Sequence, residues 1–149
     1  PEYLSNALKE ANKLQDIFTD NFGYKKTGNQ ILKESLEQAK SEGLKPQIYT
    51  HPLGTYGHSA GTTLGMWDSQ DGVPFKGDFK MNFDTVYAIE LNNRTYINEW
   101  NKEVRIMLEE AKLVVASLDV KVKDNVESLL VSPSFTSAAV IAIVGPVLS

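Results

Sequence analysis

The sequence contains no cysteine. A disulfide framework, a thiolate metal site and a cysteine nucleophile are therefore excluded, and redox chemistry leaves the cellular compartment open, with the cytoplasm favoured. The chain also lacks an excess of positive charge, because its net charge is −4, whereas domains that bind nucleic acid are usually basic. No apolar run is long enough for a confident membrane span. We therefore expect neither nucleic acid nor a membrane as a partner.

The rest of the composition is that of an ordinary soluble protein, with 42% hydrophobic and 23% charged residues. A length of 149 residues suffices for one domain with a real core, so we expect residues 1–149 to form a single domain. Apolar residues at three- and four-residue spacing predict an amphipathic helix over residues 2–22. A capping box formed by Thr27 and Gln30 predicts the start of a second helix, and Gly43 its end.

The stretch from residue 49 to residue 92 differs from the rest of the chain. It contains both histidines, His51 and His58, which are seven residues apart. Glycine permits positive φ angles and the close approach of other groups, and six of the ten glycines lie here: Gly54, Gly57, Gly61, Gly65, Gly72 and Gly77. A single histidine near a strand end is more often structural than a metal ligand. Two imidazoles among glycines are more typical of a site.

A β-rich run over residues 85–91 ends this stretch. Alternation along a strand places Glu90 on one face with Val86 and Ala88. The larger residues share the other face: Tyr87, Ile89 and Leu91. A carboxylate in an apolar strand is seldom fully buried unless it is paired or binds metal, although a solvent-facing glutamate on an edge strand would give the same pattern. With strands near 47–50 and 103–115, this run predicts an α+β fold, in which two helices pack on a curved, mainly antiparallel sheet.

Three features of the stretch carry a family resemblance: His51-Pro-Leu-Gly54, His58 seven residues later, and Ala88-Ile-Glu90. They resemble the second half of the catalytic domain of the pita-bread metallopeptidases, the superfamily of methionine aminopeptidase, Xaa-Pro aminopeptidase, prolidase and creatinase. The resemblance covers most of residues 1–116 and is closest to the Xaa-Pro aminopeptidase branch. It implies the pita-bread fold, of which this chain would be an incomplete, C-terminal portion.

The resemblance also implies a role for each residue. His51, Glu90 and Glu109 would be ligands of divalent metal, which in this family is a pair of ions, here Mn, Co or Zn. Imidazole and carboxylate suit such metals. His58 would donate to the carbonyl oxygen under attack, and Glu109 would lie near the nucleophilic water. The implied substrate is a peptide with proline in second position, from which hydrolysis releases the first residue.

The second glutamate ligand has two candidates. The family's last metal carboxylate precedes a Val-rich strand, and Leu108-Glu109-Glu110 before Leu113 resembles that step. The alignment favours Glu109 over Glu110. Strand alternation decides less, because a slip of one residue would exchange the faces of the two carboxylates. Two solvated glutamates in a charged segment are the structural alternative.

Other features of the sequence also have a structural interpretation. Trp67 either forms the wall of a substrate pocket or covers the core, with equal weight. Asp78 and Asp84 are expected at turns or strand ends and not as ligands. Asn93-Arg-Thr95 is an N-glycosylation triplet, a pattern that is common by chance. The apolar segment over residues 134–149 is expected to be a buried strand or a poorly packed terminus.

One absence argues against activity. The family's site has five protein ligands, and two of them are aspartates from an earlier β-hairpin. In this chain Asp16 and Asp20 lie on a predicted helix. We therefore expect weak metal binding and little hydrolysis, with the missing half supplied by an upstream domain or a second copy. A non-catalytic pita-bread binding module and an enzyme with non-peptidase, creatinase-like chemistry are the alternatives.

Overall fold

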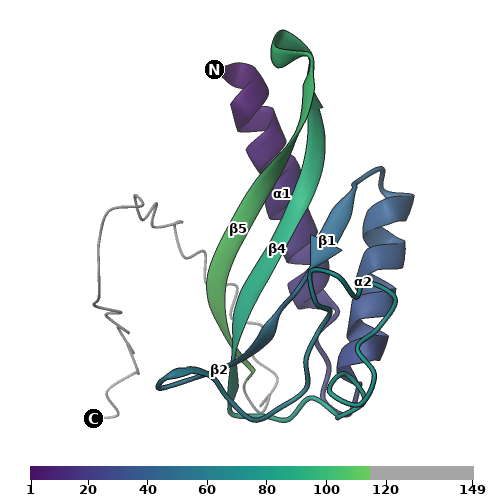
Figure 1. Ribbon diagram of the computed structural model, residues 1–149, viewed down its shortest axis with the longest axis vertical. Helices are drawn as coiled ribbons and strands as arrows, with labels where there is room; N and C mark the ends of the chain where they lie inside the picture. The colour runs from purple at the N-terminus through teal and green to yellow at the C-terminus, as the bar shows by residue number, and fades with distance from the viewer. Residues whose placement is uncertain (115–149) are drawn as a thin grey trace, which may run out of the picture. The chain divides into compact units, whose positions relative to one another are not determined.

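A computed structural model describes residues 1–114 of the protein, which lie in one compact unit. The prediction of a single domain over residues 1–149 extends outside the described residues, and the prediction of a buried strand or a poorly packed terminus over residues 134–149 lies outside them. The elements are α1 (Glu2–Asp20), α2 (Gly28–Ser41), β1 (Pro46–Ile48), β2 (His51–Gly54), β3 (Gly57–His58), β4 (Thr85–Ile97), a 3-10 helix (Asn98–Trp100) and β5 (Lys102–Val114). The predicted α+β class is confirmed, with two helices and an open antiparallel sheet (Figure 1).

Both helices begin and end close to the predicted residues. The capping box of α2 is present, because the Thr27 hydroxyl accepts from the Gln30 amide at 3.1 Å and the Gln30 side chain accepts from the Thr27 amide at 2.8 Å. Gly43 follows α2 with φ +82°, and the Leu44 amide reaches back to the Ala39 carbonyl at 3.0 Å. This is the Schellman geometry that glycine permits, so it stops the helix and turns the chain toward β1. No helix among residues 1–114 is long and apolar enough to span a membrane.

The sheet is organised around β4, which pairs with three other strands. β1 and β2 lie along one side of it, and β3 pairs with β2. β5 lies along the other side, in an antiparallel register that runs without interruption from Thr85 opposite Val114 to Ile97 opposite Lys102. The tip of the β4–β5 hairpin and the N-terminus of α1 lie at the same end of the fold (Figure 1), where the rings of Tyr3 and Trp100 are in contact. β4 is therefore the strand on which residues from distant parts of the sequence meet.

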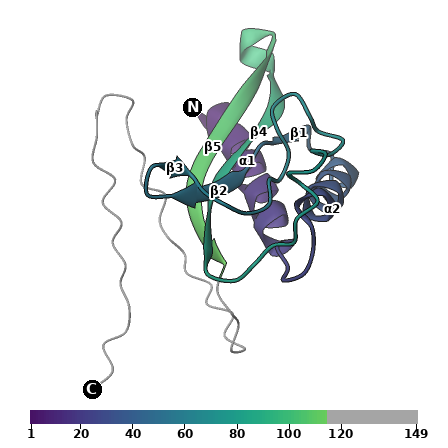
Figure 2. The ribbon, with the colours of Figure 1, turned by 60° about the horizontal axis from the view of Figure 1, so that its bottom comes forward.

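The helices cover one face of this sheet. Tyr87, Ile89 and Leu91 of β4 point to that face and are fully buried, where they join Leu14 and Phe18 of α1 in the core. In Figure 2 the strands lie in front of α1. Burial raises the pKa of Tyr87 to about 12, because a phenolate is poorly solvated there. The alternation predicted for residues 86–91 is thus confirmed, and it leaves the other face free to carry polar groups.

The upper half of β4 is longer than predicted. The predicted β-rich run ends at residue 91, but the strand continues through Asn92, Asn93 and Arg94 to Ile97. Asn93 is almost fully buried, and its side-chain amide group donates to Glu10 of α1 at 3.2 Å and accepts from the Lys45 amide at 2.8 Å. A buried polar side chain is tolerated when it is hydrogen-bonded in this way, so the strand does not need an apolar pattern here.

Candidate functional site

The candidate site lies on the face of the sheet opposite the helices. His51 is the first residue of β2 and pairs with Ala88 of β4. Side chains that are paired across antiparallel strands share a face, as do residues two apart along a strand. His51 and Glu90 therefore point to the same side of the sheet, and the side chains of both are partly buried, at 16% and 30% exposure.

The imidazole of His51 lies between two oxygen atoms. Its Nε2 atom is 3.3 Å from Oε1 of Glu90, and its Nδ1 atom is 2.9 Å from the carbonyl oxygen of Pro52. Since a carbonyl oxygen only accepts, Nδ1 carries a proton in this contact. In the neutral ring, Nε2 then presents a lone pair beside the carboxylate, and in the cationic ring it forms an ion pair with it. The neutral form is the arrangement in which histidines ligate metals, with the second ring nitrogen bonded to a carbonyl.

His58 reaches the same place through a short hairpin. β2 and β3 pair with Leu53 opposite His58, and Leu53 shares a face with His51 because the two are two residues apart. The rings of His51 and His58 lie 3.9 Å apart between centroids, with an angle of 39° between their planes. Because His58 is exposed, it lies at the solvent side of the cluster, where it can meet a ligand.

Thr50 positions Glu90, a role that the sequence analysis missed. Its side chain is fully buried, and its hydroxyl accepts from the Glu90 amide at 3.0 Å and contacts the Glu90 carbonyl oxygen at 3.2 Å. The Tyr49 amide also donates to that carbonyl at 3.0 Å. These bonds bridge the gap between β1 and β2 along β4. A threonine directly before the histidine was the one sequence signal available, and threonine is too common in strands for that signal to stand out.

The two candidate glutamates of β5 lie on opposite faces. Glu109 pairs directly with Glu90 across β4 and β5, so its Cβ atom faces the side of the sheet that carries His51. Glu110 faces α1 and accepts a hydrogen bond from the Gln15 side chain. The geometry therefore matches the face expected of Glu109 and not that of Glu110.

The predicted convergence of His51, Glu90 and Glu109 on one point is not met. Among residues 1–114, no group of three or more His, Cys, Asp or Glu side chains lies close enough together to hold a metal ion. Glu109 is exposed and does not line the hollow at the histidines. Two carboxylates directly opposite one another repel, which favours a Glu109 side chain turned toward solvent. His51, His58 and Glu90 are thus brought together, and Glu109 is placed across from Glu90 but apart from the cluster.

A hollow of about 250 Å³ opens beside the cluster. It is lined by Tyr49, His51, His58, Thr63, Gly65, Met66, Trp67, Lys76 and Glu90. Trp67 is 71% exposed, so it does not cover the core, and of its two predicted roles the structure supports that of a pocket wall. Gly65 takes φ +77°, and a Cβ atom there would lie 2.2 Å from the Ile48 carbonyl oxygen. Glycine is therefore required for the chain to pass this close to β1.

The two aspartates of this region have the structural roles predicted for them. Asp78 accepts from the Asn29 side chain at 2.8 Å and from the Phe75 amide at 2.9 Å, which closes a turn. Asp84 directly precedes β4 with φ +57°. Asp and Asn adopt this left-handed conformation more readily than most residues.

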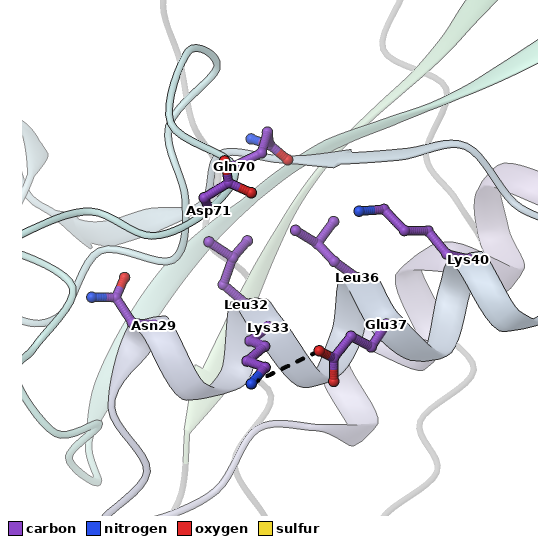
Figure 3. A pocket seen from close by; sticks show the side chains of 8 residues that line it. All are labelled: Asn29, Leu32, Lys33, Leu36, Glu37, Lys40, Gln70 and Asp71. Carbon is purple, nitrogen blue, oxygen red and sulfur yellow. Dashed lines mark ion pairs between the residues drawn. The ribbon is translucent and has the colours of Figure 1, made fainter.

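A second hollow, of about 370 Å³, lies between α2 and Gln70-Asp71. Its floor is formed by Leu32 and Leu36, and Lys33 and Glu37 pair along the helix at 3.9 Å (Figure 3). Its lining includes neither histidine. It has no metal-ligating imidazole and is separate from the candidate site.

Comparisons with protein-family models, with curated proteins and with solved structures found no match to this chain.

Proposed function

We propose that this chain carries the histidine and glutamate part of a metal-dependent aminopeptidase site of the Xaa-Pro type, in a pita-bread fold. The observation that carries the proposal is the approach of His51 Nε2 to Glu90 Oε1 at 3.3 Å, with the ring of His58 tilted against that of His51. The residues come from two separate parts of the sequence, in the order and spacing that the resemblance requires. The periodicity of apolar residues alone does not predict that these three side chains lie close together.

The donor atoms of this cluster fit a divalent ion such as Mn, Co or Zn, because they are an imidazole nitrogen with its second nitrogen bonded and a carboxylate oxygen. Such an ion, when bound, lowers the pKa of a water molecule so that hydroxide is available to attack a peptide carbonyl. His51 and Glu90 would hold it. Glu109 would join them by a change of side-chain rotamer, since it lies directly across from Glu90.

The other residues of the site would act on the peptide. His58 lies at the solvent side of the cluster, where its ring N–H would donate to the carbonyl oxygen of the bond being cleaved. The hollow of about 250 Å³ beside it would receive the side chains on either side of that bond. The products would be a free first residue and a peptide that begins with proline.

The site is proposed to be incomplete in this chain. The resembled enzymes add two aspartates from another hairpin. In this chain Asp16 and Asp20 both lie in α1 and not in a hairpin. With three ligands of five, an ion would be held loosely, and small misplacements of the reacting groups are costly to rate. We therefore expect the isolated chain to hydrolyse little or no peptide. A segment that bears the two aspartates, from an upstream domain or a second copy, would complete the site.

A non-catalytic binding module is the second candidate. The exposed Glu109 and the lack of a three-residue ligand group among residues 1–114 favour it. Such a module would keep the hollow and its histidines but would not cleave the peptide. Creatinase-like, non-peptidase chemistry is the third candidate, and no specific feature of the described residues favours it.

Cobalt absorption spectroscopy tests the metal site without relying on activity. We expect weak Co²⁺ binding by the chain, reduced at least about tenfold by His51→Ala or by Glu90→Gln, because each removes a donor. Glu110→Gln is the matched control, since Glu110 faces α1, and it should bind as the unaltered chain does. Equal Co²⁺ spectra for the unaltered chain and His51→Ala would refute the metal role of His51.

A peptide assay separates the candidates. The chain is incubated with Mn²⁺ and a proline peptide, with and without an added segment that bears two aspartates. Turnover only with the segment supports the peptidase proposal. Strong turnover by the chain alone that His51→Ala abolishes would contradict its incompleteness, and metal and peptide binding without turnover in either case would favour the binding module.

A further inference from the structure

A chain of side-chain hydrogen bonds fixes the backbone of Trp67 at the hollow. The Gln47 side chain donates from Nε2 to the carbonyl oxygen of Trp67 at 2.6 Å. Its Oε1 atom accepts from the side chain of Asn92 at 3.0 Å, and Asn92 is almost fully buried in β4. The position of Trp67 is thus tied to the strand that also carries Glu90.

The rest of the segment over residues 66–70 is tied to β1 by Gln70. Its Nε2 atom donates to the carbonyl oxygens of Ile48 and Met66, both at 2.7 Å, and its Oε1 atom accepts from the Ile48 amide at 3.0 Å. The primary amide of Gln70 thereby engages both backbone groups of Ile48, as the backbone of a neighbouring strand would. Since Met66 and Ser69 also exchange two backbone bonds, the segment is closed on itself as well.

The indole of Trp67 is exposed although its backbone is held. A large apolar side chain that covers no core and stands on a fixed backbone offers a surface to a ligand at low entropic cost. Tyr49 and Met66 line the same hollow, and so do the two histidines, Glu90, Thr63 and Lys76. The lining therefore combines aromatic and apolar surface with nitrogen and oxygen donors.

We propose that Trp67 is a specificity-determining residue, whose indole contacts the apolar side chain of the first residue of a bound Xaa-Pro peptide, and that Gln47 is a positioning residue that holds Trp67 there. The peptide class rests on the proposed function. The preference for an apolar first residue comes from the hollow itself. An apolar wall gains affinity from each apolar group that it removes from water and gains nothing from a polar group of the same shape.

Tryptophan fluorescence tests this inference, because the protein has only two tryptophans. Trp100→Phe leaves Trp67 as the single reporter and changes a half-exposed residue in the 3-10 helix at the tip of the β4–β5 hairpin. The probes are Leu-Pro and Asn-Pro, which are matched in the size of the first residue, titrated in the presence of Zn²⁺. We expect Leu-Pro to shift the Trp67 emission to shorter wavelength and to bind about tenfold more tightly than Asn-Pro.

Three variants give the expected pattern. Trp67→Phe should keep the preference for Leu-Pro. Trp67→Ala, for which peptide binding is measured by calorimetry, should abolish that preference. Gln47→Ala should reduce the preference and lower the fluorescence anisotropy of Trp67, since the carbonyl at residue 67 loses its donor. Gln38→Ala is the matched control and should change neither quantity, because the Gln38 side chain bonds to Asn21 and Glu42, the residues that follow α1 and α2.

A separate arm distinguishes failure of this inference from failure of the proposed function. Co²⁺ quenches a nearby indole, so it should quench Trp67 in the Trp100→Phe protein and lose this effect with His51→Ala. If that arm succeeds and Leu-Pro and Asn-Pro bind equally, or Leu-Pro binds without Trp67 responding, the role of Trp67 is refuted. If Co²⁺ quenches Trp67 equally with and without His51, the proposed function fails instead, and the inference fails with it.

Discussion

The two faces of β4 carry different kinds of structure on one strand. Toward the helices, Tyr87, Ile89 and Leu91 are fully buried among other apolar groups. On the opposite face, the Glu90 carboxylate lies beside His51, and the Glu90 backbone is held by hydrogen bonds to the Thr50 hydroxyl. The first face is stabilised by the area it removes from water, which has no direction. The second depends on a few directional contacts, each of modest net energy.

This difference teaches where each kind of substitution should act. Changes on the helix face should alter the stability of the whole unit, because its members share one core. Changes at the candidate site should alter local geometry and ligand binding with a smaller effect on the free energy of unfolding. The following predictions test that separation, from the largest expected effect to the smallest.

Gly65→Ala should disrupt the core and the candidate site together, which is the exception to the separate effects expected for the two faces of β4. The new Cβ atom would lie 2.2 Å from the Ile48 carbonyl oxygen and 2.9 Å from Leu32 in the core. We expect a loss of more than about 4 kcal/mol in the free energy of unfolding, or no folded protein. Gly43→Ala is the matched control, since it has a similar φ of +82° and no atom within 4 Å of the added Cβ, and it should cost about 1–2 kcal/mol. Equal losses in urea denaturation would show that the close approach is unimportant.

Ile89→Ala and Glu90→Ala compare the two faces at neighbouring residues. Ile89 is fully buried, so its truncation should cost about 2–5 kcal/mol. Glu90 is partly exposed and its carboxylate contacts the His51 ring at 3.3 Å, so its truncation should cost no more than about 1 kcal/mol. The measurement is the free energy of unfolding in urea for both variants. A larger cost at Glu90 than at Ile89 would contradict the division of roles between the faces.

Thr50→Val should loosen Glu90 while keeping the shape of the side chain. The lost hydroxyl leaves the Glu90 amide without its 3.0 Å acceptor, and an unmet buried amide costs about 1–3 kcal/mol. Hydrogen exchange at the Glu90 amide should accelerate more than exchange at Leu91. Thr50→Ser, which keeps the hydroxyl, should restore slow exchange. Unchanged exchange in Thr50→Val would show that this hydroxyl does not position Glu90.

Glu109→Gln should have the smallest effect and the opposite sign. Glu109 lies directly across from Glu90, and removing one of two like charges in such a pair should stabilise the protein by about 0.2–1 kcal/mol in metal-free buffer. Glu110→Gln should change stability less, because its side chain can still accept from Gln15 of α1. If Glu110→Gln stabilises the protein more than Glu109→Gln does, the assignment of the two carboxylates to their faces is wrong.

The fold was largely predictable because its signals are local. The spacing of apolar residues in α1, the capping box at Thr27 and the alternation from Val86 to Leu91 each reflect neighbours in the sequence. The end of β4 was not predictable in this way. The buried side chain of Asn93 is hydrogen-bonded to the Glu10 side chain and the Lys45 amide, which are distant in sequence.

The candidate site was predictable only in part, for the same reason. The resemblance selected His51, His58 and Glu90, which the structure brings together. It gave no access to Thr50, whose role depends on a gap between two short strands. The resemblance also implied that Glu109 is a metal ligand together with His51 and Glu90. The rotamer of an exposed carboxylate, however, depends on local repulsion and solvation. Backbone register follows from pattern, but the final direction of a flexible side chain does not.

The burial of Asn93 has a consequence for covalent modification. Its Nδ2 atom, the atom to which a glycan would be joined, bonds to Glu10 at 3.2 Å and to Thr95 at 3.1 Å, and the residue is 1% exposed. An attached sugar would have to displace α1 from β4. Glycosylation of the Asn93-Arg-Thr95 triplet and completion of this packing are therefore mutually exclusive, so a transferase could act only on a chain in which α1 has not yet packed on β4.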